Sequence, residues 1–128
     1  MAHKIVEGLL YTESDEWVRV EGEIAIVGIT DYAQDKLGDI VYIEEAVQGN
    51  KVVKEDKVAT IESVKAASDI NAPVSGEIVE VNKSVVKDPA IVNNDPYSKG
   101  WLFKIKIDNT EEIKDLLNAK GYEEYRKE

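Results

Sequence analysis

The sequence predicts a mainly β protein with a short internal helix and a C-terminal helix. Short apolar runs that alternate with polar residues recur along the chain, as they do in β-strands. Gly, Asn, Asp and Pro separate these runs and favour turns. Two segments have apolar residues at helical spacing. The 128 residues fit one domain over 1–128, with a core over about 8–107 and a C-terminal helical segment over about 109–126.

The first third of the chain predicts a hairpin, a helix and a third strand. Residues 17–20 and 23–29 are the two strands of the hairpin, and Glu21 and Gly22 form its turn. Thr30 can cap a short helix that ends at Gly38, a residue that commonly follows a helix. Residues 39–44 form the third strand.

The remainder predicts three more strands and the C-terminal helix. The strands lie over residues 57–61, 77–81 and 101–107, and residues 82–100 are expected to be mostly loop. Asn109 or Thr110 caps the helix, and Gly121 ends or interrupts it. The apolar stripe of this helix contains Ile113, Leu116 and Leu117 and is expected to cover the sheet. Trp17 and Trp101 are expected to lie in the core.

Two short segments on either side of Lys65 have similar sequences. The segment 51–56, with sequence KVVKED, resembles SVVKD at 84–88, and each precedes a further apolar run. Two similar halves on either side of a central hairpin favour a pseudo-twofold sandwich of sheets.

Lys65 lies at the bend between extended segments, within the stretch ESVKAASDI at 62–70. Its neighbours Ala66 and Ala67 are small, so no bulky side chain shields the amine. A lysine at a protruding hairpin tip suits covalent attachment of a cofactor, because the amine can enter the pocket of a modifying enzyme. The amine must lose a proton there, since its usual pKa is about 10.4. The competing interpretation is an ordinary solvated lysine.

Composition excludes several kinds of site. The net charge of −10 argues against nucleic acid and anionic membranes as partners, and favours either solubility or attraction to basic enzyme surfaces. The chain has no cysteine and one histidine, so thiolate chemistry and a multi-histidine metal site are excluded. We expect no catalytic residues and no metal. The number of acidic residues does not, however, exclude a catalytic pair of carboxylates like that of glycosidases.

The first residues predict a cytoplasmic protein. An acid follows soon after the start, no apolar signal segment is visible, and no run of 18 apolar residues exists.

Five motifs occur along the chain in a characteristic order and spacing. They are YT at 11–12 followed by EWV at 16–18, GITDYAQ at 28–34 with LGD at 37–39, ESVKA at 62–66, DPY at 95–97 and GWL at 100–102. Together they resemble the H-protein family of the glycine cleavage system, and the resemblance extends from about Gly8 to Tyr125. It implies a lipoyl-type barrel–sandwich hybrid, and lipoate joined by an amide to Lys65.

The resemblance further implies a non-catalytic lipoyl-carrier domain. Such a protein takes the aminomethyl group of glycine from a pyridoxal-phosphate-dependent glycine decarboxylase to a tetrahydrofolate-dependent aminomethyltransferase. Its next partner is dihydrolipoamide dehydrogenase. A lipoate-attaching enzyme modifies the protein before it carries any cargo. The resemblance places Ser14, Glu16 and Asp69 at a cleft where the loaded arm rests. The alternative is that Glu16 and Asp69 are solvated acids.

Two departures from the family pattern accompany the motifs. Members often have histidine where this chain has Asp15, which leaves any imidazole role there in question. The loop 46–50 also lacks a proline that is frequent at this point, which is expected to affect only the shape of the loop.

Other classes remain open at this point. Biotin carriers usually have methionine on both sides of the lysine, where this chain has Val64 and Ala66. Lipoyl domains of 2-oxoacid dehydrogenases usually have aspartate before the lysine, are shorter and belong to larger chains. A relay that passes lipoate to other proteins and an unmodified interaction module are the further alternatives.

Overall fold

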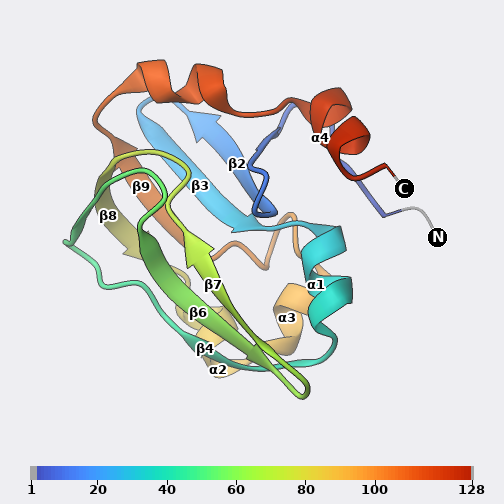
Figure 1. Cartoon of the computed structure of the whole chain (residues 1–128). Helices are drawn as coiled ribbons and strands as arrows, with labels where there is room; N and C mark the ends of the chain where they lie inside the picture. Colours follow the sequence, from blue (N-terminus) through green and yellow to red (C-terminus); the bar gives the residue numbers. More distant parts are fainter. Residues whose placement is uncertain (1–2, 128) are drawn as a thin grey trace.

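Two antiparallel β-sheets form the framework of the protein (Figure 1). The structure is a computed structural model that describes residues 3–127; residues 1, 2 and 128 of the predicted domain lie outside the described residues. The larger sheet has six strands in the order β1-β2-β3-β9-β8-β5. These strands are β1 (Leu10–Tyr11), β2 (Glu16–Glu21), β3 (Ile24–Ile29), β5 (Lys51–Val52), β8 (Gly76–Val81) and β9 (Phe103–Ile107).

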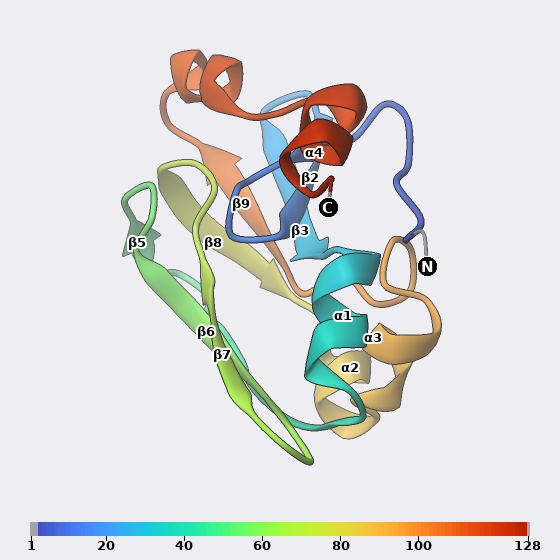
Figure 2. The same ribbon diagram turned by 45° about the vertical axis from the view of Figure 1, so that its right-hand side comes forward.

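The smaller sheet has three strands and contains the hairpin that has Lys65 at its tip. Its order is β4 (Ile40–Glu44), β6 (Lys57–Ser63) and β7 (Ala67–Asn71). The β6–β7 hairpin projects beyond the rest of the molecule in both views (Figures 1 and 2). The predicted strands occur with small changes at their ends. However, β7 begins two residues after Lys65, inside the stretch 62–70 for which the sequence predicts only a bend between extended segments.

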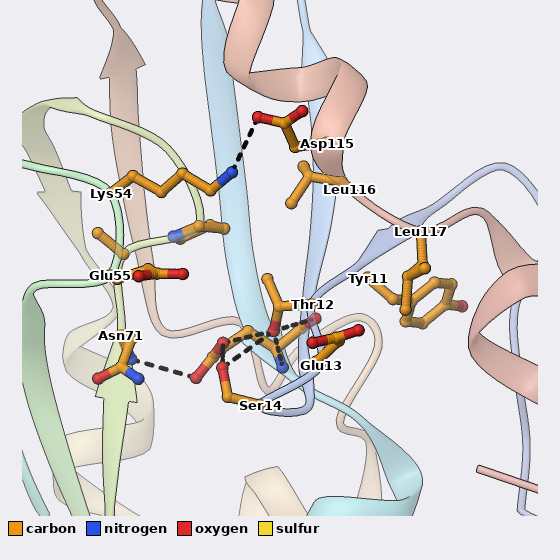
Figure 3. A pocket seen from close by; sticks show the side chains of 13 residues that line it. Tyr11, Thr12, Glu13, Ser14, Lys54, Glu55, Asn71, Asp115, Leu116 and Leu117 are labelled. Carbon is orange, nitrogen blue, oxygen red and sulfur yellow. Dashed lines mark hydrogen bonds and ion pairs between the residues drawn. The ribbon is translucent and has the colours of Figure 1, made fainter. Parts of the chain in front are cut away.

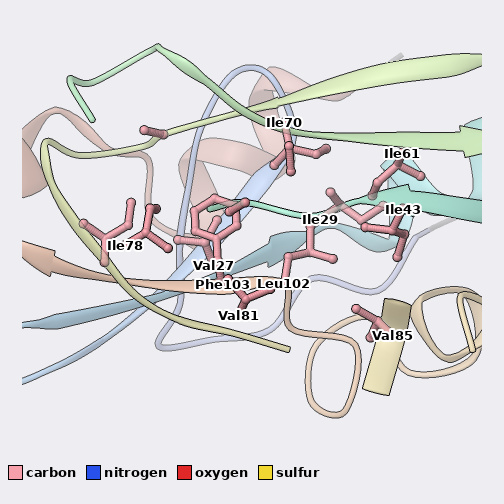
Figure 4. Close-up of a cluster of buried hydrophobic side chains, with 14 of the residues drawn as sticks. Val27, Ile29, Ile43, Ile61, Ile70, Ile78, Val81, Val85, Leu102 and Phe103 are labelled. Carbon is pink, nitrogen blue, oxygen red and sulfur yellow. The ribbon is translucent and has the colours of Figure 1, made fainter. Parts of the chain in front are cut away.

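The main hydrophobic core lies between the two sheets (Figure 4). Alternate residues of each strand point into it, because successive side chains of a strand face opposite sides of the sheet. Ile61 from β6 and Phe103 and Ile105 from β9 are fully buried, with no exposed surface. This arrangement confirms the mainly β class.

The helix α1 (Asp31–Leu37) begins and ends as predicted. The Thr30 side chain accepts a hydrogen bond from the Ala33 amide, which satisfies a free donor of the first turn. Gly38, with a φ of 80°, follows the helix and donates its amide to the Gln34 carbonyl. Backbone freedom is needed at this position because few side chains tolerate positive φ.

The expectation of a loop over residues 82–100 is wrong. Two short helices occupy much of this segment, α2 (Lys83–Lys87) and α3 (Ala90–Asn94). Asn82 caps α2, and each helix buries one valine in the main core, Val85 and Val92. The residues around Pro89 therefore separate two helices instead of preventing helix formation.

The predicted C-terminal helix is divided into two parts. A 3₁₀ helix, η1 (Thr110–Asp115), is followed by a break and then by α4 (Ala119–Tyr125). In the break, Leu117 exchanges two backbone hydrogen bonds with Tyr11, of 2.7 and 2.8 Å, which hold this segment against β1. The Asn118 side chain accepts from the Gly121 amide and caps α4, so Gly121 lies inside a helix that it was expected to end or interrupt.

The two segments of similar sequence do not form a structural repeat. Residues 51–52 of the first copy form the strand β5, whereas residues 84–87 of the second copy lie in the helix α2.

The aromatic residues and the C-terminal stripe contribute to two cores. Trp17 is fully buried in a second cluster with Tyr11 and Tyr122. Trp101 and Leu117 pack on this cluster and are half-buried, whereas Ile113 and Leu116 pack on the main core. The packing role predicted for these residues is therefore confirmed, with only Trp17 fully enclosed. Among residues 3–127, no helix has the length and apolar character needed to cross a membrane.

Candidate functional site

The tip of the β6–β7 hairpin is a compact four-residue turn from Ser63 to Ala66. The Ser63 amide donates to the Ala66 carbonyl at 2.7 Å, and the Ser63 hydroxyl accepts from the amides of Lys65 and Ala66 at 3.3 and 3.0 Å. The Val64 amide donates to the Asp39 carbonyl at 3.0 Å, which ties the tip to the start of β4. The backbone at Lys65 is thus held firmly while its side chain is exposed.

The Lys65 side chain lies beside Gly38, just after α1. A Cβ atom at Gly38 would be 3.4 Å from Lys65 Cε and 3.9 Å from Nζ, which is ordinary contact. Tip residues 64–67 are all exposed, so the amine is open to a large partner. This placement is the one predicted for a lysine that is modified by another enzyme.

A pocket of about 550 Å³ lies between the turn that precedes β2 and the end of β7 (Figure 3). The strand β7 connects the lysine tip with this pocket, since its last residue, Asn71, is a lining residue. Ser14 and Glu16 form part of the lining. The other lining residues are Tyr11, Thr12, Glu13, Lys54, Glu55, Ala72, Pro73, Asp115, Leu116 and Leu117.

Glu16 is buried, with 1% of its surface exposed, and its carboxylate is held by three donors. Oε1 accepts from the Thr12 hydroxyl at 2.5 Å and the Ser14 hydroxyl at 2.6 Å. Oε2 accepts from the Asn71 backbone amide at 3.1 Å. The interpretation of Glu16 as a solvated acid is therefore wrong.

Burial raises the pKa of the Glu16 carboxyl above its ordinary value of 4.5, and the bonds from Ser14, Thr12 and Asn71 partly oppose this rise. A carboxylate has about four acceptor positions, so three donors leave about one free. A cationic group in the pocket would satisfy that position and offset the cost of burying the charge.

Asp69 is separate from this arrangement. Its side chain is 61% exposed, and Oδ1 lies 3.8 Å from Lys57 Nζ on the neighbouring strand. It does not line the pocket. The structure therefore brings Ser14 and Glu16 together and leaves Asp69 on β7, between the lysine tip and the pocket.

Sequence reasoning missed two groups at the site. Thr12 was noted only as part of a motif, although its spacing of four residues from Glu16 suits a turn closed by a side chain. The Asn71 donor is a backbone amide, which no residue pattern can reveal, because its role depends on where β7 ends relative to β2.

Comparisons with known proteins point to one family. The family model for the glycine cleavage H-protein matches residues 9–128. A glycine cleavage system H protein of Carboxydothermus hydrogenoformans is 48% identical over 124 residues, covering 97% of this chain and 95% of the relative. One from Thermus thermophilus is 54% identical over 114 residues, covering 89% of each chain.

A solved structure gives the same result for the fold. The crystal structure of a glycine cleavage system H protein from Mycobacterium marinum superimposes with a TM-score of 0.86 at 36% identity, covering 94% of this chain and 97% of that one. The lipoyl-type barrel–sandwich hybrid expected from the motifs is confirmed. With an exposed lysine on a sheet hairpin and a family match over nearly its whole length, the chain belongs to the H-protein family of the glycine cleavage system, a family of lipoyl carriers.

Proposed function

We propose that this chain carries the aminomethyl group of glycine on a lipoyl group attached to Lys65. The route leads from glycine decarboxylase to the tetrahydrofolate-dependent aminomethyltransferase and then to dihydrolipoamide dehydrogenase. The observation that supports this proposal is the exposed Lys65 on a rigid hairpin tip in a member of the H-protein family. Residues 1–128 act as a single carrier domain that catalyses none of these steps.

The residues at the tip fit a lipoyl group. The group supplies a cyclic disulfide that can be opened, loaded and reoxidised. Lys65 provides the amine for the amide bond, and the small side chains of Ala66 and Ala67 leave it accessible. The hydrogen bonds that the Ser63 hydroxyl accepts from the backbone amides of Lys65 and Ala66 keep the tip closed, so that the attachment point stays fixed while the arm moves.

We further propose that Ser14 and Glu16 hold the cationic cargo in the pocket between visits to the enzymes, and that Asp69 attracts it on the way from Lys65. Glu16 supplies the free acceptor position in the pocket, and Ser14 orients its carboxylate through the 2.6 Å hydrogen bond. Asp69 lies along β7 on the way from Lys65, where an exposed carboxylate attracts the amine. The excess of acids, with a net charge of −10, also favours partner enzymes with basic surfaces. The cytoplasmic location stays a prediction.

The attachment is tested by mass spectrometry of the chain after incubation with lipoate and a lipoate-attaching enzyme. We expect an increase equal to one lipoyl group, located on Lys65 by peptide mapping. Modification at another lysine, or none at all, would contradict the proposal. A biotin adduct in a parallel incubation with biotin and a biotin-attaching enzyme would place the chain in another class of carriers.

The cleft is tested with the variants Glu16→Gln and Asp69→Asn, singly and together. After loading by the decarboxylase and removal of that enzyme, the release of formaldehyde and ammonia measures the lifetime of the cargo. An ion pair worth about 1 kcal/mol changes a rate by about fivefold. We expect release to be at least about fivefold faster in the double variant, with most of the effect from Glu16, because this residue lines the pocket.

Lipoylation of these variants should be unchanged, because attachment precedes loading. Asp108→Asn, which removes one exposed acid outside the pocket, is the matched control for the net charge of each single variant. Release at the unmodified protein's rate in the double variant would rule out a protective cleft.

A further inference from the structure

The turn that presents Ser14 and Glu16 has an unusual backbone. Asp15, between them, has a φ of 74°, in the left-handed region that few side chains adopt without cost. The turn is closed by the bond from the Asp15 amide to the Thr12 carbonyl at 3.2 Å, and from the Thr12 amide to the Glu16 carbonyl at 3.0 Å. Such a conformation persists only where the surrounding structure stabilises it.

Tyr122 of α4 and Arg126, the residue that follows this helix, supply this stabilisation. The Arg126 guanidinium binds the Asp15 carboxylate with two parallel bonds, Nε to Oδ1 at 2.8 Å and Nη2 to Oδ2 at 2.7 Å. Nη2 also donates to the Glu13 carbonyl at 3.1 Å, and the Tyr122 hydroxyl donates to Asp15 Oδ1 at 2.8 Å. Paired bonds of this kind fix orientation as well as distance.

This network is shielded from water. The Asp15 side chain is 16% exposed and that of Arg126 is 26% exposed, so their attraction is screened less than that of a surface pair. Burial raises the pKa of Tyr122, whose hydroxyl therefore stays protonated and remains a donor. Arg126 also lies over the ring of Tyr32 on α1, 4.4 Å from its centroid, which orients the guanidinium.

The same network reaches the start of α1. The Tyr122 and Thr30 hydroxyls are 2.8 Å apart, and the Thr30 amide donates to the Asp15 carbonyl at 3.0 Å. Three parts of the chain therefore meet at Asp15: the turn before β2, the first residue before α1, and α4. In Figure 2, α4 lies above α1 and beside the chain that leads into β2.

We propose that α4 positions the cargo pocket, with Arg126 and Tyr122 holding the turn 12–16 through Asp15 so that Ser14 and Glu16 face the end of β7. Arg126 is thus a positioning residue that acts through a neighbour and touches no cargo. This inference rests on the proposed function of the pocket. If the turn relaxes, the Glu16 carboxylate withdraws from the Asn71 amide, its partner across the pocket.

The Asn71 amide gives a direct readout in the unmodified protein, by hydrogen exchange measured by NMR. In Arg126→Met the exchange of this amide should be at least about tenfold faster, because a bidentate charged contact is lost. Lys120→Met removes an exposed cation from the same helix and should leave the rate unchanged. Asp15→Asn, which tolerates the same backbone conformation, should reproduce the acceleration if Arg126→Met does not fold.

A double-variant comparison separates positioning from general loss of stability. If both residues act through one contact, Asp15→Asn combined with Arg126→Met should accelerate exchange at Asn71 no more than the stronger single variant. Exchange of core amides such as that of Phe103 reports global opening and should change less than that of Asn71. Equal acceleration at both amides, or none at Asn71, would overturn the proposal.

The lifetime of the cargo links the network to function. Arg126→Met should shorten it as Glu16→Gln does, with normal lipoylation of Lys65. A shorter lifetime in Glu16→Gln but not in Arg126→Met would overturn the positioning role. If Asn71 exchange accelerates while neither variant alters the lifetime, the positioning role stands and the protective function of the pocket fails.

Discussion

Replacing Lys65 with arginine should abolish lipoylation and all carrier activity while leaving the fold intact. Arginine keeps the positive charge and reach, but its guanidinium stays protonated and offers no amine for the amide bond. Because the Lys65 side chain is exposed, the free energy of unfolding should change by less than about 0.5 kcal/mol. Intact mass, glycine–carbon dioxide exchange and a denaturation curve together measure the outcome.

The matched control is Lys87→Arg, an exposed lysine at the end of α2. This variant should be lipoylated and active. Exchange activity in Lys65→Arg would show that another residue holds the cofactor. A large loss of stability in Lys65→Arg would instead assign a structural role to the lysine.

Trp17→Ala should cause the largest loss of stability among the residues discussed, about 3–5 kcal/mol. The Trp17 ring has no exposed surface, and its indole N–H donates to the Pro96 carbonyl at 2.8 Å. The ring also lies directly on Gly28, since a Cβ there would be only 2.6 Å from three of its atoms.

Urea denaturation checks this prediction through a lower midpoint at an unchanged slope. Trp101→Ala is the comparison, because Trp101 is only half-buried. Its loss should be clearly smaller. Equal losses in the two variants would contradict the finding that Trp17 is fully enclosed in the second cluster whereas Trp101 only packs on it.

The sequence predicted the elements whose signals are local. Alternation of apolar residues located most strands, and Thr30 and Gly38 defined both ends of α1. The strand β7 was missed because ASDIN contains one fully buried position, so its pattern alone is weak; pairing with β6 makes it a strand. The C-terminal segment breaks at Leu117 because pairing with Tyr11 replaces a helical turn, a long-range contact that helical periodicity does not reveal.

The site was predictable to a similar degree. Family motifs pointed to Lys65, Ser14 and Glu16, and the structure places Ser14 and Glu16 in one pocket. The burial of Glu16 depends on the meeting of β2 with β7, 55 residues further along the chain. The contact between Asp15 and Arg126 joins residues 111 positions apart, and neither residue belongs to a motif that would suggest the pair.

Glycine–carbon dioxide exchange with the cognate decarboxylase tests the central claim most directly. The assay compares the chain lipoylated on Lys65 with the same chain left unmodified. We expect exchange that increases with the concentration of the lipoylated chain and is absent with the unmodified one. Failure of the fully lipoylated chain to support exchange would contradict its role as the glycine cleavage carrier and would favour a lipoate relay.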